Sequence, residues 1–203
     1  NVKFDNASGS TNRNTIFQVN GAGNVVFTGV LDNVNGAVGT SELRKYSTGT
    51  LTFNAANSVA ESTLQLFRGT TIFQGAATAA GATSLNVYQN AVLTFDDTVT
   101  YTTNRLANKP LQILGGTANF LPAATGSGQF SSAALTLGNG GSTINLGSGG
   151  NLAVTFASLT QNGGATLDLI GLFGTTNNKL LFTAAPGLTG GAVAATNGLL
   201  ARI

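Results

Sequence analysis

Short runs in which every second residue is apolar recur along the whole chain. They include IFQV at 16–19, TLTF at 50–53, TLQL at 63–66, LQI at 111–113, LTL at 135–137 and TLDL at 166–169. Successive side chains of a strand point to opposite faces, so each run predicts a strand with one buried and one wet face. Apolar residues are not spaced for a helix over three turns anywhere, and glycine or a β-branched residue interrupts nearly every window. The pattern predicts an all-β protein.

One strand type ends in a large apolar residue, and these residues recur at a nearly constant interval. The set, which we call the core ladder, is Phe27, Phe53, Phe73, Phe95, Phe120, Leu146 and Leu169. Successive gaps are 26, 20, 22, 25, 26 and 23 residues. A period of roughly 24 residues lies in the range of solenoids and other repeat arrays. We therefore expect these side chains to stack on one another inside the protein.

A second strand precedes the first by one tight corner in each period. The corner residues read RG at 68–69, QN at 89–90, GG at 115–116 and GNGG at 138–141. Glycine and asparagine tolerate positive φ and can bend the backbone sharply. Two strands, a corner and a variable loop predict a right-handed parallel β-helix, or β-solenoid, of about eight coils of roughly 20–26 residues. A β-sandwich or barrel is the alternative, because antiparallel hairpins alternate in the same way.

No linker rich in proline or serine divides the chain, so we expect a single domain over residues 1–203. The polar start, 1–15, is predicted to be an N-terminal cap or loop, and 98–110 an outer loop. The end, 199–203, reads LLARI and has the character of a strand. Because a solenoid ends in unpaired strand edges, we predict that Leu199, Leu200 and Ile203 engage a neighbour, either more of a longer polypeptide or a second copy added head to tail.

The amino-acid composition argues against several classes of partner and site. Only 8% of residues are charged against 42% hydrophobic, with 28 glycines, so Thr, Ser and Asn must solvate most of the surface. The nine basic residues are scattered, which argues against nucleic acid as a partner. Cysteine is absent, which excludes disulfides and thiolate metal sites. No apolar run reaches the roughly 18 residues of a membrane span, so we expect no membrane insertion. Since the chain starts at Asn1 without a signal peptide, we interpret it as a processed product.

Few residues of this sequence are suited to catalysis or to binding a ligand. We predict no catalytic, cofactor-binding or metal-binding residue. The acidic residues come together only at Asp96–Asp97, which we interpret as a solvated turn, and histidine is absent. The glycine-rich stretch 138–144 lacks the Asp of a calcium β-roll, and 147–150 lacks the Lys of a phosphate loop. The triplet NAS at 6–8 fits a glycosylation site by composition alone.

Three tyrosines form the remaining candidate. Tyr46, Tyr88 and Tyr101 would make a carbohydrate-stacking row if they aligned on one face, but their separations of 42 and 13 residues do not suggest whole coils.

Two segments resemble known repeats. The GTLTF at 49–53 and the TLQL at 63–66 resemble the autotransporter-associated β-strand repeat, and residues 135–185 are similar to large repeat-bearing surface proteins of bacteria such as planctomycetes. The resemblance implies an exported, elongated and non-enzymatic protein. We therefore expect a structural segment of an extracellular or cell-surface stalk, coat or fibre that is not an enzyme. The alternative is an adhesin or a module that binds surface glycans through outer loops such as 98–110.

Overall fold

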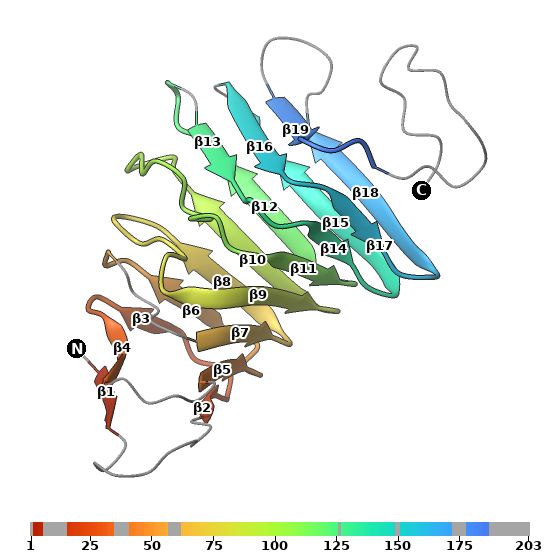
Figure 1. Cartoon of the computed structure of the whole chain (residues 1–203). Helices are drawn as coiled ribbons and strands as arrows, with labels where there is room; N and C mark the ends of the chain where they lie inside the picture. Colours follow the sequence, from red (N-terminus) through yellow and green to blue (C-terminus); the bar gives the residue numbers. More distant parts are fainter. Residues whose placement is uncertain are drawn as a thin grey trace.

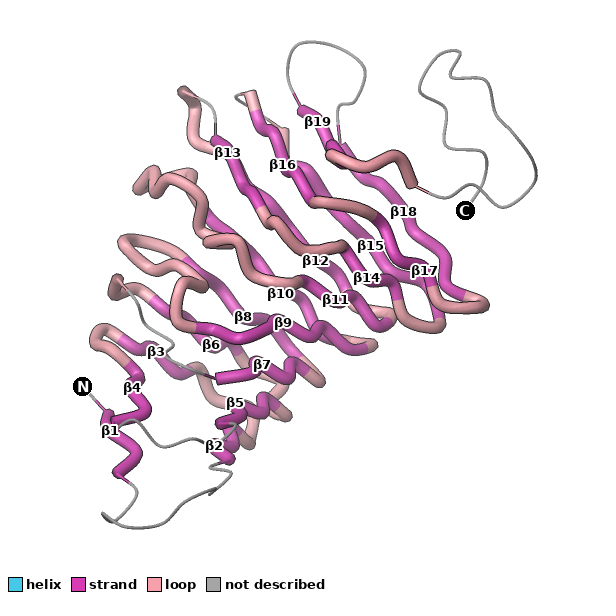
Figure 2. The backbone as a smooth tube through the Cα atoms, in the orientation of Figure 1, coloured by secondary structure: helices cyan, strands magenta, loops and turns pink. Residues whose placement is uncertain are grey.

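A computed structural model describes residues 2–5, 16–34, 41–56, 62–125, 127–148, 151–171 and 178–186. These residues form a parallel β-solenoid in which strands and turns alternate and no helix occurs (Figure 2). The strands climb in chain order from one end of the stack to the other (Figure 1). The predicted fold class is confirmed.

Two seven-stranded parallel sheets make up the body of the solenoid. We call sheet I the stack of β2 (Ile16–Val19), β5 (Ser41–Lys45), β7 (Ser62–Leu66), β9 (Ala82–Tyr88), β11 (Leu111–Leu114), β14 (Leu135–Leu137) and β17 (Leu159–Gln161). Sheet II is the stack of β3 (Val25–Phe27), β6 (Thr50–Phe53), β8 (Gly69–Phe73), β10 (Ala91–Asp96), β12 (Thr117–Leu121), β15 (Gly140–Leu146) and β18 (Ala165–Gly171). Each strand pairs in parallel with its equivalent one turn away, as a β-solenoid requires.

A third, shorter set of strands closes some turns and was not predicted as a separate layer. It consists of the pair β1 (Val2–Asp5) and β4 (Leu31–Val34), and of β13 (Ser127–Phe130), β16 (Leu152–Phe156) and β19 (Asn178–Phe182). In the middle turns, loops take the place of this strand. The variable loop of the sequence repeat therefore contains a strand in some turns and none in others, including the long connection 97–110 between β10 and β11.

The expected number of coils was too high. Seven strands in each main sheet correspond to about six turns over the described residues, against the eight obtained by dividing the whole chain by its period. That division also counted 6–15 and 187–203, which lie outside the described residues. The predicted interface residues Leu199, Leu200 and Ile203 fall in the second of these segments.

The core ladder lies where the repeat placed it, with one exception. Register aligns Phe27, Phe53, Phe73, Phe95, Phe120 and Leu146 in one column. The rings of neighbouring phenylalanines in this column are 4.9–5.6 Å apart between centroids. Sheet I supplies the opposite wall of the core with a column of leucines, namely Leu43, Leu64, Leu85, Leu111 and Leu135, each at most 1% exposed.

Leu169 is the exception. It pairs with Ile144, while Gly171 stands opposite Leu146, so Leu169 lies in the neighbouring inward column. The corner between β17 and β18 is one residue longer than that between β14 and β15, which moves the strand along its neighbour. Alternation fixes which face a residue occupies, but it does not distinguish two positions on the same face.

The predicted corners carry the expected backbone. Gly69, Asn90, Gly115 and Gly140 all have positive φ, between 63° and 101°. Gly69 is also needed for space, because a Cβ there would lie 2.6 Å from the Gly49 carbonyl oxygen of the preceding turn. Tight corners between the two sheets therefore depend on residues that the sequence places at the right interval.

Candidate functional site

The segment between β10 and β11 holds a buried ion pair. Arg105 Nε lies 2.5 Å from Asp97 Oδ1, and their side chains are 0% and 1% exposed. The prediction of an outer loop at 98–110 is wrong for this part of the segment, because Arg105 and Leu106 point into the protein. A buried charge without a partner would cost several kcal/mol, so the two residues depend on each other.

Neighbouring polar groups form hydrogen bonds with the remaining nitrogens of Arg105 and with the second oxygen of Asp97. Arg105 donates Nη1–H to the Ala77 carbonyl at 2.8 Å and Nη2–H to the Thr100 carbonyl. Asp97 accepts from Gln129 Nε2 at 3.2 Å through its second oxygen. The arrangement connects three successive turns, since Ala77, Arg105 and Gln129 belong to neighbouring levels of the stack. It is suited to holding a loop in place, because both oxygens of Asp97 are buried and accept hydrogen bonds from within the protein.

The adjacent Asp96 is engaged differently. Its Oδ1 accepts from the amide of Thr98 at 2.9 Å and from the Thr98 hydroxyl at 2.6 Å, which closes a local turn. Asp96 thus fits the predicted turn, whereas Asp97 is buried, so the interpretation of both as solvated residues is wrong for Asp97. The two carboxylates serve different contacts and do not converge on a common point, as general acid–base chemistry by a pair would need.

Lys45 occupies a core position, although the residues around it do not indicate that a lysine is buried there. It stands in the inward column between Val19 and Leu66 and is 0% exposed. Its Nζ donates to the carbonyls of Ser47 at 2.7 Å, Gly49 at 2.8 Å and Arg68 at 2.7 Å. Burial lowers the pKa of Lys45 to about 8. The ammonium group joins two corners of the stack and is enclosed, so it has no access to a ligand.

An aromatic column runs along the outside of sheet I. Tyr46 stacks on Phe67 with ring centroids 4.6 Å apart and an interplanar angle of 4°, and Phe67 stacks on Tyr88 at 4.4 Å and 15°. The 42 residues between the tyrosines are two turns of 21, with Phe67 at the intermediate level. The separation therefore does correspond to whole coils, and the interpretation to the contrary is wrong. Phe67 completes the aromatic column between the two tyrosines. Tyr101, 49% exposed, lies apart on the loop before β11.

The stacking limits what this column can bind. Sugar rings pack on the faces of aromatic rings, and here the faces of Phe67 are covered on both sides. Tyr88 also donates its hydroxyl to Gln65 Oε1 at 2.8 Å, and burial raises the pKa of its phenol. The column therefore acts first as a cross-strand ladder that stabilises the sheet.

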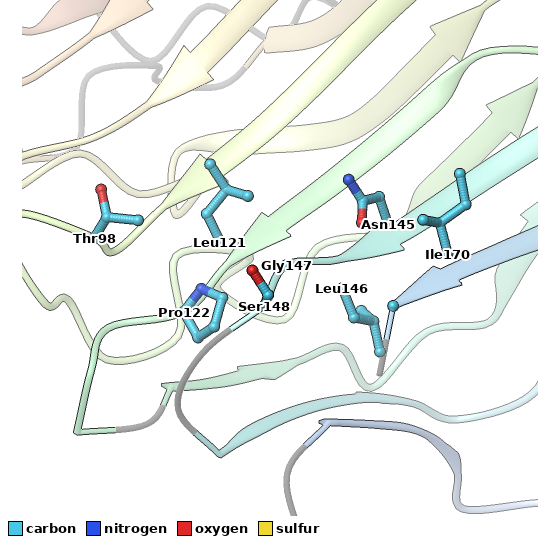
Figure 3. A pocket seen from close by; sticks show the side chains of 9 residues that line it. Thr98, Leu121, Pro122, Asn145, Leu146, Gly147, Ser148 and Ile170 are labelled. Carbon is cyan, nitrogen blue, oxygen red and sulfur yellow. The ribbon is translucent and has the colours of Figure 1, made fainter. Parts of the chain in front are cut away.

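A shallow groove of about 450 Å³ lies at the carboxyl ends of β12, β15 and β18 (Figure 3). Its lining is uncharged and consists of Thr98, Leu121, Pro122, Asn145, Leu146, Gly147, Ser148, Ile170 and Gly171. In Figure 3 these side chains stand around the groove without converging on one point. Such a lining offers contact area and the hydroxyls of Thr98 and Ser148, but no charged side chain and no base to activate a hydroxyl.

The described residues are poor in groups that bind metal ions. They contain no group of three or more His, Cys, Asp or Glu side chains able to hold a metal ion. The glycine-rich stretch 138–144 forms a corner and the start of β15. Across the same ranges, no helix has the length and hydropathy to cross a bilayer. The triplet at 6–8 lies outside them.

Comparison with protein-family models, with curated proteins and with solved structures finds no match to this chain.

Proposed function

We propose that this chain is a structural β-solenoid segment of an extracellular or bacterial cell-surface protein, serving as part of a stalk, coat or fibre. One observation carries the proposal: columns of buried, mostly apolar side chains run through the described turns, and the paired charged groups serve the fold. Asp97 and Arg105 pair inside, Lys45 binds three carbonyls, and Arg44 pairs with Glu42 at 2.6 Å. The resemblance to autotransporter-associated repeats supports the same location and a non-enzymatic role.

The outer face of sheet II carries hydroxyl side chains, and these support the proposed scaffold role. One outward column consists mostly of hydroxyl side chains, namely Thr50, Thr70, Val92, Thr117 and Thr143. Threonine favours strands and hydrogen-bonds to water without adding charge. A surface of this kind suits a protein whose task is to keep its shape outside the cell.

Incomplete burial at both ends of the stack supports the proposed contact with a neighbouring segment or second copy. Inward residues in the middle are fully buried, whereas those at both ends are only half-buried, for example Phe17 and Phe27 at one end and Leu169 and Phe182 at the other. Within the described ranges, no strand pairs with the outer edge of β17 or β18. Apolar edges of this kind accept further strands, from a continuing polypeptide or from a second copy.

Electron microscopy combined with light scattering tests the scaffold. Six steps of about 4.8 Å give the described stack a length of about 29 Å. We expect particles of constant width that lengthen with protein concentration or with added flanking sequence. Compact monomers at every concentration, together with a longer polypeptide that does not extend the rod, would contradict the proposal.

A second candidate is an adhesin or glycan-binding module. It is favoured by the tip of the loop before β11, where Val99 is 94% and Tyr101 49% exposed on a segment fixed by the buried ion pair. A preorganised loop loses little entropy on binding. A glycan array with the native protein and with a Val99→Ser, Tyr101→Ser variant decides between the two. Saturable binding lost in the variant supports the adhesin, and a pure scaffold shows none.

We also propose that the chain is not an enzyme. Asp96→Asn and Asp97→Asn variants of a polysaccharide-cleaving enzyme would lose activity. We expect the native protein to show no cleavage of a polysaccharide panel, and turnover that both variants abolish would overturn this expectation.

A further inference from the structure

Asn–Gly pairs form several corners between sheet I and sheet II. Three lie in the described residues, at 20–21, 139–140 and 162–163, and two more, at 35–36 and 197–198, lie outside them. In such a pair, the backbone amide nitrogen of glycine can attack the side-chain carbonyl carbon of asparagine, because no Cβ obstructs the approach. The reaction needs that amide to be free and the corner to have room to move.

The corner at 139–140 lacks the first of these conditions. The Gly140 amide donates to the Gly164 carbonyl of the next turn at 3.4 Å. On the other side, a Cβ on Gly115 would lie 3.7 Å from the Asn139 carbonyl oxygen, and one on Gly138 would lie 2.2 Å from Leu114 Cδ2. Asn139 and Gly140 are exposed, and a Cβ on Gly140 would lie 3.9 Å from Gly115 Cα, so this corner differs from the other two mainly by its hydrogen-bonded amide.

The corner at 162–163 is open. Asn162 and Gly163 are exposed, and a Cβ on Gly163 would meet nothing within 4 Å. The neighbouring backbone is anchored, since the Asn162 amide donates to Leu137 and the Ala165 amide to the Asn162 carbonyl. Within the described residues, the Gly163 amide donates no hydrogen bond. The attacking nitrogen is thus free, in a corner whose ends are fixed.

The corner at 20–21 is open in the same way at the other end of the stack. Asn20 and Gly21 are exposed, and a Cβ on Gly21 would meet nothing within 4 Å. The Gly21 carbonyl accepts from Thr48, but among the described contacts its amide donates to none. Both open corners lie on the end turns of sheet I, where a neighbouring turn covers one side only.

We propose that Asn162 and Asn20 are sites of spontaneous deamidation, and that Asn139 is protected by the stack. The Gly163 amide nitrogen forms a bond to Asn162 Cγ, the bond from Cγ to the side-chain nitrogen breaks, and ammonia leaves with the proton of the glycine amide. Water then opens the succinimide at either carbonyl and yields aspartate or isoaspartate. Each conversion replaces a neutral amide by a carboxylate, so two conversions change the formal net charge from +2 to 0 (+2 − 2 = 0).

Peptide mapping by mass spectrometry of the folded full chain, incubated at mildly alkaline pH, tests the proposal. Conversion at Asn162 and Asn20 should exceed that at Asn139 by about two- to tenfold, the factor expected for breaking one hydrogen bond first. In concentrated urea the three sites should convert at similar rates, because the protection comes from the fold. Equal rates in the folded protein, or protection that persists in urea, would overturn the proposal.

A matched variant separates chemistry from unfolding. Gly163 does not have positive φ and has open space at its Cβ position, so Gly163→Ala should leave the melting temperature unchanged. The added methyl group should slow conversion at Asn162 several-fold and leave Asn20 unaffected. An unchanged rate at Asn162 with an intact fold would refute the attack by the Gly163 amide.

Discussion

Truncation of one ring in the core ladder tests the stacked interior directly. Phe73 is 0% exposed, and its ring lies 4.9 Å from Phe53 and 5.5 Å from Phe95. Phe73→Ala removes the ring from the middle of the column and leaves a cavity between two turns, so it should lower the free energy of unfolding by about 3–5 kcal/mol. Phe73→Leu should cost less than about 1.5 kcal/mol, because Leu146 occupies the same column at 0% exposure.

Two companion variants define the comparison. Phe27 ends the column and is only half-buried, so Phe27→Ala should cost clearly less than Phe73→Ala. Val99 is 94% exposed, and Val99→Ala should change stability by no more than about 0.5 kcal/mol. Urea denaturation followed by far-ultraviolet circular dichroism measures all four variants. If Phe27→Ala cost as much as Phe73→Ala, or if Phe73→Ala matched Val99→Ala, the continuous buried column would be refuted.

The polar groups inside the stack give further predictions. The buried Thr71 hydroxyl finds no hydrogen-bond partner among the described residues, so Thr71→Val should stabilise the protein by about 1 kcal/mol, and a lower melting temperature would show that the hydroxyl is satisfied. Arg105→Met should cost about 3–5 kcal/mol by leaving Asp97 buried alone, and adding Asp97→Asn should recover part of that loss in a double-mutant cycle. Burial lowers the pKa of Lys45 to about 8 from 10.5, so the unfolded chain binds more protons between these values and stability should rise with pH from about 8 to 10.5. Urea titrations at several pH values should show that Lys45→Met reduces this slope, and an unchanged slope would assign it to other groups. Gly69→Ala should lower the melting temperature by several degrees through strain at φ +63° and contact with Lys45, whereas a neutral result would mean that the corner can shift.

The sequence alone determined the periodic part of this protein. Alternation of apolar residues identified the strands, and the recurrence of Phe53, Phe73 and Phe95 identified the stack, because parallel pairing places equivalent residues over one another. Glycine and asparagine at the corners followed from their tolerance of positive φ. These properties belong to short segments or recur in successive turns, so they can be recognised in a single sequence.

Only the tertiary structure decided where the repeat departs from its own period. One extra corner residue moved Leu169 beside Ile144, and a phenylalanine at the intermediate level joined Tyr46 to Tyr88. Neither the spacing of the large residues nor that of the tyrosines contains this information, because loop length varies between turns.

The tertiary structure also decided which charged residues are buried. Lys45 is buried because carbonyls from two corners meet at its ammonium group, and Arg105 is buried because Asp97 and the Ala77 carbonyl meet at its guanidinium. Two of these partners, the carbonyls of Arg68 and Ala77, come from other turns of the solenoid, more than twenty residues away in the chain. Burial of a charge depends on partners gathered from separate turns, and the identity of the residue does not reveal whether those partners converge.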